Sequence, residues 1–217
     1  RGYLWVDLFF CLSGFVLASN YGALFANGFS GAAFANFLQR RLARVYPLYA
    51  VVFVVQLALT VLLYGDFAHR QMWAAAILKH PVRDIGANVL MVQAWGLARS
   101  VTGQAWSVSI EWAAYIAFPL LVGVILSGQQ RRMIGAGGVA LLLLALVAEF
   151  DLHDGAYHSG AMDAYDGARI TPLLRCFGDF MLGLLAARGH RLPRVAAACG
   201  NNAVVLLTIS AVAAMFA

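Results

Sequence analysis

The stretch Trp5-Val6-Asp7-Leu8-Phe9-Phe10-Cys11-Leu12-Ser13-Gly14-Phe15 places one carboxylate inside an otherwise apolar segment. An ionised group in hydrocarbon costs about 2.5 kcal/mol or more, so such a residue usually faces the interior of a helical bundle and marks a site. The plainer alternative is that Asp7 lies near the outer end of the segment and reaches the membrane interface. The stretch predicts a membrane-spanning helix that carries a functional acid.

The composition of the whole chain supports a membrane protein. The 217 residues are 62% hydrophobic and 12% charged, whereas soluble domains have about 25% charged residues. A membrane-spanning helix needs about 20 mostly apolar residues, and six segments come near or reach that length: residues 2–21, 42–64, 108–126, 133–150, 170–187 and 203–217. We expect an all-α, polytopic transmembrane bundle with about six spans, forming one membrane-embedded domain over residues 1–217. Because the chain starts with Arg1 and stops while still apolar, we expect it to be a fragment.

Basic residues indicate the orientation of the spans. Three arginine clusters separate or flank them, and the positive-inside rule places all three in the cytoplasm: Arg40, Arg41 and Arg44; Arg131 and Arg132; Arg188, Arg191 and Arg194. The chain must then cross the membrane an even number of times between residues 64 and 108. Two short apolar runs there, residues 72–78 and 85–98, predict a re-entrant or interfacial helical pair rather than full spans.

The net charge does not indicate nucleic-acid binding, and the cysteines do not indicate a disulfide framework or a metal site. A net charge of +5 could suggest nucleic acid, but the chain has no patch that interleaves basic and aromatic residues, so we expect no nucleic-acid partner. Three cysteines without short spacing indicate neither a disulfide framework nor a zinc site, and we expect no metal.

Arg41 and Arg44 are three residues apart and share a helix face where a loop is expected to meet the span, with Pro47 setting off the first turn. Two guanidinium groups on one face form a fork that suits phosphate oxygens. The alternative is ordinary charge that sets the topology.

A second polar group opens the span that begins near residue 108. Ser107, Glu111 and Tyr115 follow one another at intervals of four and so form a column on one helix face. Ser107 or Ser109 could cap the helix, and Glu111 could be a first-turn residue favoured by the helix dipole. That alternative leaves Tyr115 without a role.

Arg175 and Asp179 are four residues apart within one expected span and can pair on one helix face. Such a neutral pair can be purely structural. An arginine at that depth could equally hold Asp7 or Glu111.

Together these stretches resemble the acyltransferase family 3 of integral membrane O-acyltransferases, which modify surface polysaccharides, lipopolysaccharide and related glycans. The resemblance covers most of the chain and rests on the following pieces, of which the last is the weakest: Gly2 to Phe10 continuing through Leu12-Ser13-Gly14-Phe15; Arg41-Leu42-Ala43-Arg44-Val45-Tyr46-Pro47; Trp106-Ser107-Val108-Ser109-Ile110-Glu111 with Tyr115 and Pro119; and Arg175 with Phe180 and Gly183.

The resemblance implies a bundle of about ten helices in the bacterial cytoplasmic (inner) membrane. It would transfer an acyl group, by default acetyl, from cytoplasmic acyl-CoA to a hydroxyl of an extracytoplasmic glycan or lipid-linked sugar. No bound cofactor is implied, because acyl-CoA is a substrate. Arg41 and Arg44 would hold the phosphates of the donor. Further candidate substrate-binding residues are Ser13, Trp106, Ser107, Tyr115 and Arg175.

The catalytic histidine of the family lies on a helix that precedes the Val-Asp-Leu-Phe-Phe motif, so it is expected upstream of Arg1. That imidazole would be the general base, and Asp7 and Glu111 would orient it or the acceptor. Without it the chain alone is expected to be inactive. The competing interpretation is a transporter or flippase for a lipid-linked glycan, in which Asp7, Glu111 and Arg175 would line the pathway. The absence of an internal repeat favours the enzyme.

Overall fold

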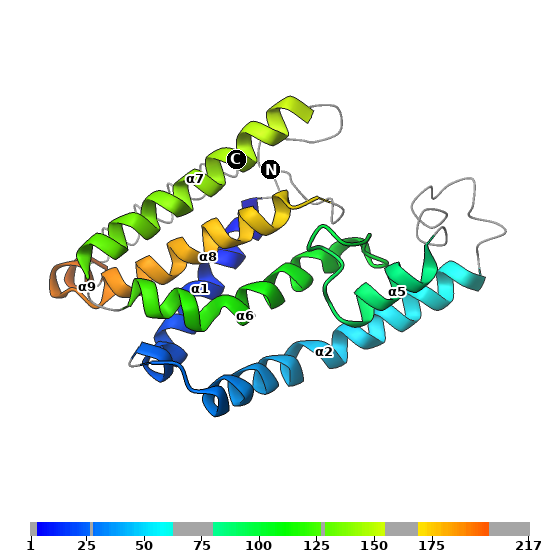
Figure 1. Ribbon diagram of the computed structural model, residues 1–217, viewed down its shortest axis with the longest axis horizontal. Coiled ribbons are helices and arrows are strands. Elements are labelled where there is room, and N and C mark those ends of the chain that lie inside the picture. Colours follow the sequence, from blue (N-terminus) through cyan, green and yellow to red (C-terminus); the bar gives the residue numbers. More distant parts are fainter. Residues whose placement is uncertain (1–3, 27, 63–79, 127–128, 155–168, 200–217) are drawn as a thin grey trace. The chain divides into compact units, whose positions relative to one another are not determined.

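The computed structural model describes residues 4–26, 28–62, 80–126, 129–154 and 169–199, in which all regular structure is helical. The all-α prediction is therefore confirmed for this part of the chain. Along the sequence (Figure 1) the elements are α1 (Leu4–Ala26), α2 (Gly31–Leu62), α5 (Pro81–Val89), the short 3₁₀ helix η1 (Gly103–Ala105), α6 (Trp106–Ile125), α7 (Gln130–Asp154), α8 (Thr171–His190) and α9 (Pro193–Cys199).

Four helices in the described residues are long and apolar enough to cross a membrane: Leu4–Ala26, Gly31–Thr60, Trp106–Ile125 and Gln130–Phe150. They match four of the expected spans. The helix α8 forms where a fifth was expected, but it carries Arg175, Asp179 and Arg188 and is not among the apolar candidates. The segment 203–217 lies outside the described residues. An integral membrane protein is supported, and the count of about six spans is not confirmed.

The start of the second span was wrongly predicted. Helix α2 begins at Gly31, well before the expected start at residue 42, so Arg41 and Arg44 lie inside a continuous helix rather than at a junction between loop and helix. Seven of the residues 31–41 are alanine, leucine, glutamine or arginine, which favour helix. Pro47 also lies inside α2, and proline is tolerated within membrane helices because neighbouring groups satisfy the freed backbone.

Contacts divide the chain into two compact units, which are described separately. The prediction of a single domain over residues 1–217 stays a prediction. The first unit combines Arg1–Ser30, Phe118–Asp163 and Arg175–Ala217, and the second combines Gly31–Ala117 and Ala164–Leu174.

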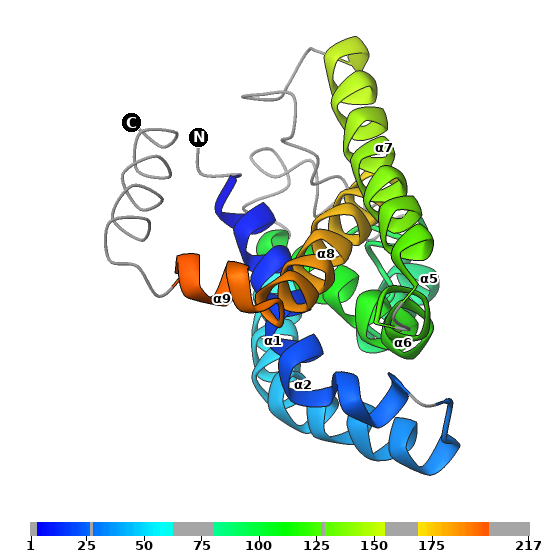
Figure 2. The same cartoon turned by 90° about the vertical axis from the view of Figure 1, so that its left-hand side faces the viewer.

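In the first unit, α8 lies between α1 and α7 (Figures 1 and 2). Small residues allow the backbones to approach closely. A Cβ atom on Gly183 of α8 would collide with the carbonyl of Cys11 on α1, and one on Gly14 of α1 would collide with the carbonyl of Phe180. On the other side of α8, a Cβ on Gly178 would lie 3.1 Å from the carbonyl oxygen of Ala140 on α7. Glycine therefore sets the spacing of these three helices, as in other membrane bundles.

In the second unit, the segment that follows α5 packs against α2. Tyr49, Phe53, Met91 and Val101 form its buried apolar cluster. The hydroxyl of Tyr49 donates a hydrogen bond of 2.6 Å to the backbone carbonyl of Asn88 at the end of α5. With nine residues, α5 is about 14 Å long, too short to cross a membrane. The first run of the expected re-entrant pair, 72–78, lies outside the described residues, so the pair stays a prediction.

Asn88 also holds the loop that returns from α5 towards α6. Its amide donates to the carbonyls of Asp84 (2.7 Å) and Arg99 (2.9 Å), and its side-chain oxygen accepts a bond of 3.0 Å from the amide of Val101. Asn88 is fully buried. These bonds satisfy backbone groups that an irregular segment would otherwise leave unpaired in an apolar setting.

The start of α6 is attached to the same loop. The hydroxyl of Ser109 donates to the carbonyl of Met91 (2.8 Å) and accepts from the amide of Ala94 (3.2 Å), and the indole of Trp95 donates to the carbonyl of Ser109 (2.9 Å). Ser109 is therefore not a helix cap, one of the two options that the sequence left open. Its bonds hold Met91, which has a φ of +56°, a conformation that is uncommon for residues other than glycine.

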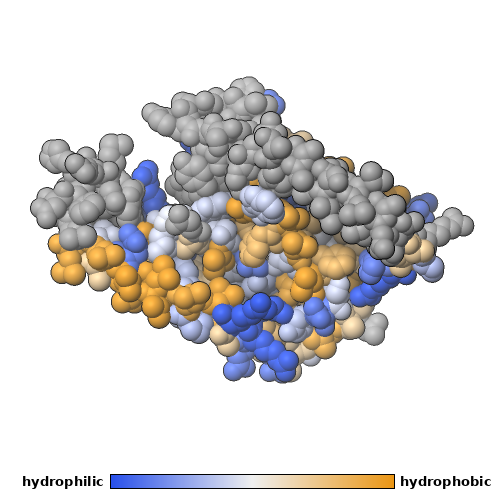
Figure 3. All heavy atoms as spheres, turned by 180° about the vertical axis from the view of Figure 1, so that it is seen from behind, coloured by the Kyte–Doolittle hydropathy of each residue, from blue (hydrophilic) through white to orange (hydrophobic). Residues whose placement is uncertain are grey.

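Many large apolar side chains face outward, as Figure 3 shows by the extensive orange surface of the described residues. On α2 they include Leu48 (72% exposed), Val51 (61%) and Leu62 (77%). Apolar patches of this extent mark a surface that contacts lipid or another protein. The exposure agrees with α2 being a candidate span.

Candidate functional site

The acid that opens the sequence is paired with an arginine on another helix. Arg175 of α8 donates from Nε to Oδ1 of Asp7 (2.5 Å) and from Nη2 to Oδ2 (2.9 Å), which is a two-point ion pair. Arg175 is 1% exposed and Asp7 is 18% exposed. Of the alternatives left open by the sequence, the structure supports the one in which Arg175 holds Asp7 across the bundle. Two parallel charge-assisted bonds also fix the direction of the carboxylate.

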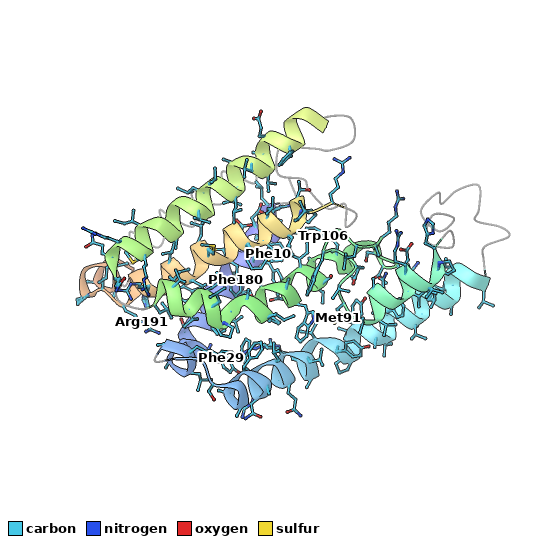
Figure 4. The ribbon with its side chains drawn as sticks, in the orientation of Figure 1. Phe10, Phe29, Met91, Trp106, Phe180 and Arg191 are labelled. Atoms are coloured by element: carbon cyan, nitrogen blue, oxygen red, sulfur yellow. The ribbon has the colours of Figure 1, made fainter. Side chains whose placement is uncertain are left out.

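The close packing of α1 and α8 brings this pair together. Asp7 lies one helical turn before Cys11, whose carbonyl faces Gly183. Figure 4 labels Phe10 of α1 and Phe180 of α8, which are both fully buried. Any larger side chain at Gly183 would separate the two backbones near Asp7.

Asp179 was one of the possible partners of Arg175 that the sequence left open, and its place in the site was missed. It is 6% exposed. Its carboxyl group lies within hydrogen-bonding reach of that of Asp7 and near the charge of Arg175, while its Oδ2 atom has no hydrogen-bond partner in the structure. The i, i+4 spacing to Arg175 was the available signal, but it suggested a simple pair and not two carboxyl groups near one guanidinium.

Ser13, a candidate substrate-binding residue, also belongs to α1 and is half-buried. It lies on the turn after Phe10, two residues from Cys11. The structure places it in the same unit as the Asp7–Arg175 pair. Its proposed role in substrate binding stays a prediction.

Arg41 and Arg44, in the second unit, have different surroundings. Arg41 is half-buried and lies over the ring of Phe37, with its guanidinium carbon 5.9 Å from the ring centroid. Arg44 is exposed. The ring of Phe37 in turn meets Tyr115 edge-on at 6.2 Å. Arg41 is therefore held by an aromatic side chain, and Arg44 is open to a ligand.

Glu111 and Tyr115 of α6 are both buried in the second unit, at 7% and 6% exposed, while Ser107 and Trp106 are half-buried. Helix α6 begins at Trp106 and has no acidic residue in its first turn. This is evidence against Glu111 as a first-turn residue stabilised by the helix dipole. The ring of Trp112 meets Tyr115 edge-on at 6.5 Å and so limits its rotation.

Asp7 and Glu111 belong to different units, so the hypothesis that they form one polar site stays a prediction. Among the described residues, no group of three or more His, Cys, Asp or Glu side chains could hold a metal ion.

Comparison with known proteins identifies the family. The model of the acyltransferase domain family (acyltransferase family 3) matches residues 1–216. The chain belongs to this family, and the resemblance drawn from its motifs is confirmed.

Two curated relatives are similar over parts of the chain. One is "Acyltransferase MdmB" of Streptomyces mycarofaciens, with 28% identity over 150 residues, covering 67% of this chain and 35% of the relative. The other is "Protein 2 in picA locus" of Rhizobium radiobacter, with 48% identity over 62 residues, covering 29% of this chain and 31% of the relative. The chain thus matches about a third of the length of these relatives. No solved structure gives a significant match.

Proposed function

We propose that this chain is part of a membrane O-acyltransferase, which moves an acyl group from cytoplasmic acyl-CoA to a hydroxyl of an extracytoplasmic glycan or lipid-linked sugar. The observation that carries the proposal is the family match over residues 1–216. An acyl donor with phosphate groups suits Arg41 and Arg44. Acetyl is the simplest acyl group in this class.

The reaction joins the acceptor oxygen to the thioester carbonyl carbon and breaks the bond from that carbon to sulfur. The acceptor hydroxyl must lose its proton as it attacks, and the departing thiolate gains one, so no net proton is consumed. A general base is needed because an alcohol is hardly ionised near neutral pH. The histidine that the family resemblance places before the Asp7 motif would fill this role.

The buried carboxyl groups orient the reacting groups in this scheme. Arg175 holds Asp7 by two bonds, which leaves its carboxylate fixed and charged beside the expected position of the base. Glu111, in a buried column with Tyr115, is suited to bind the acceptor hydroxyl or the base. Buried charges that cost several kcal/mol in an apolar helix are retained where they serve such a site.

The test measures thiol release from acetyl-CoA by the purified full-length protein, with and without a glycan acceptor. We expect free coenzyme A only when the acceptor is present. Glu111→Gln should lower turnover about 100-fold, as misplacement of a reacting group does, while the protein remains monodisperse in detergent. Glu149→Gln, at an exposed position of α7, is the matched control and should keep normal turnover.

Substrate movement across liposomes without acyl transfer would instead support a transporter and overturn the proposal. Normal turnover in a well-folded Glu111→Gln enzyme would remove Glu111 from the site but leave the reaction class in place.

A further inference from the structure

The cluster formed by Asp7, Arg175 and Asp179 contains more acidic groups than basic ones. It contains two carboxyl groups and one guanidinium, so it carries a net charge of −1 if both acids are ionised. Asp179 is 6% exposed and Arg175 is 1% exposed. An uncompensated charge in such surroundings is strongly unfavourable, and the group usually takes up a proton instead.

No second cation faces Asp179 from the described helices around it. On α1 the titratable groups near it are Asp7 and the thiol of Cys11, and on its own helix the group is Arg175. The helix α7 contributes apolar contacts at Gly178, which meets Leu144 and Ala140. Near Phe180, α6 contributes the ring of Phe118 at 6.3 Å.

The carboxyl groups of Asp7 and Asp179 lie within hydrogen-bonding reach of each other, and a hydrogen bond between them requires a proton, because two carboxylates are both acceptors. The proton has one favoured position. Asp7 accepts two bonds from Arg175, and such charge-assisted bonds favour its ionised form. Asp179 has an oxygen, Oδ2, without any partner, and a buried carboxylate would leave that oxygen unsatisfied at high cost.

We propose that Asp7 and Asp179 form a buried proton-binding site, in which Asp179 is a neutral carboxylic acid that donates a hydrogen bond to the ionised Asp7. Asp179 is thus a positioning residue: it acts on the proposed acyl transfer through Asp7, whose carboxylate it fixes together with Arg175. This role rests on the proposed function, but the presence of the proton does not.

Infrared spectroscopy of the full-length protein in lipid tests the proton directly. A protonated carboxylic acid has a C=O stretching band above the amide I band, which shifts down in D₂O. We expect the wild-type protein at neutral pH to show such a band, and Asp179→Asn to lack it. Glu149→Gln is the control: it removes a carboxyl group at an exposed position of α7, away from the Asp7–Asp179 pair, and should leave the band unchanged.

Asp179→Glu keeps the acid and should move the band rather than remove it, which identifies the band even if the Asn variant does not fold. A wild-type protein without a protonated carboxyl band at neutral pH would overturn the proposal. A band unchanged in both Asp179 variants would overturn it too.

Turnover tests the positioning role. Asn can still donate a hydrogen bond to Asp7, so Asp179→Asn should keep turnover within about threefold of wild type, whereas Asp179→Leu, which has no donor, should lose about tenfold or more. Equal losses in both folded variants would show that the negative charge of Asp179 is needed and would contradict a neutral acid. If no variant or wild-type protein transfers an acyl group, the proposed function fails, while the infrared result still decides the proton site.

Discussion

Replacing Gly183 with alanine tests whether the contact between α1 and α8 sets the geometry of the site. The new Cβ would collide with the backbone carbonyl of Cys11, and a backbone atom cannot rotate away as a flexible side chain can. The helices must separate, which costs about 1–3 kcal/mol for an overpacked interface. Alanine also favours helix over glycine by about 1 kcal/mol, so the net effect at Gly183 alone could be small.

Gly189→Ala in the same helix separates the two contributions. Nothing lies within 4 Å of a Cβ at Gly189, so this control gains helix propensity without a clash. The free energy of unfolding of the two variants should therefore differ by the strain alone, about 1–3 kcal/mol. Such a difference is a factor of about 5 to 150 in the unfolding equilibrium.

The assay is reversible unfolding of the full-length protein in mixed micelles of detergent and SDS, followed by far-UV circular dichroism. Turnover measured in the same preparations should fall in Gly183→Ala and not in Gly189→Ala, since separation of the backbones moves Asp7 away from Arg175. Equal unfolding free energies and equal turnover in the two variants would refute the argument that glycine at 183 brings the ion pair together.

Three further predictions concern the second unit and the topology. Arg44→Lys keeps the charge but loses the planar fork, so the apparent KM for acyl-CoA should rise. Unchanged donor kinetics in Arg41→Ala and Arg44→Ala, with normal protein levels, would remove both arginines from donor binding. Asn88→Leu leaves the buried backbone groups of Arg99 and Val101 without their partner and should lower the free energy of unfolding by about 1–3 kcal/mol; a thermal melt that matches wild type would contradict this. Single cysteines at positions 67 and 103, in a background without native cysteines, should label from the same side of intact cells, and labelling from opposite sides would show that the orientation derived from the arginines is wrong.

The sequence by itself predicted the helical class and the family. Apolar segments of membrane-spanning length depend only on composition and on the cost of unpaired backbone in lipid, so α1, α6 and α7 lie close to the expected ranges. The family motifs are short and local, and the match over residues 1–216 confirms the family that they indicate. The start of α2 was missed because the arginines were taken as the edge of the span, whereas one continuous helix runs through them.

The tertiary structure alone decided which polar groups meet. Arg175 could have paired with Asp179 on its own helix, and spacing along one helix cannot show which of several carboxyl groups an arginine reaches. The choice depends on how closely two helices far apart in sequence approach, and Gly14 and Gly183 set that approach by the absence of a Cβ. The same holds for Ser109, whose bonds to Met91 and Ala94 depend on where the loop folds back. Hydropathy and spacing describe a helix and its faces, but the partner of a buried charge is fixed by packing between helices.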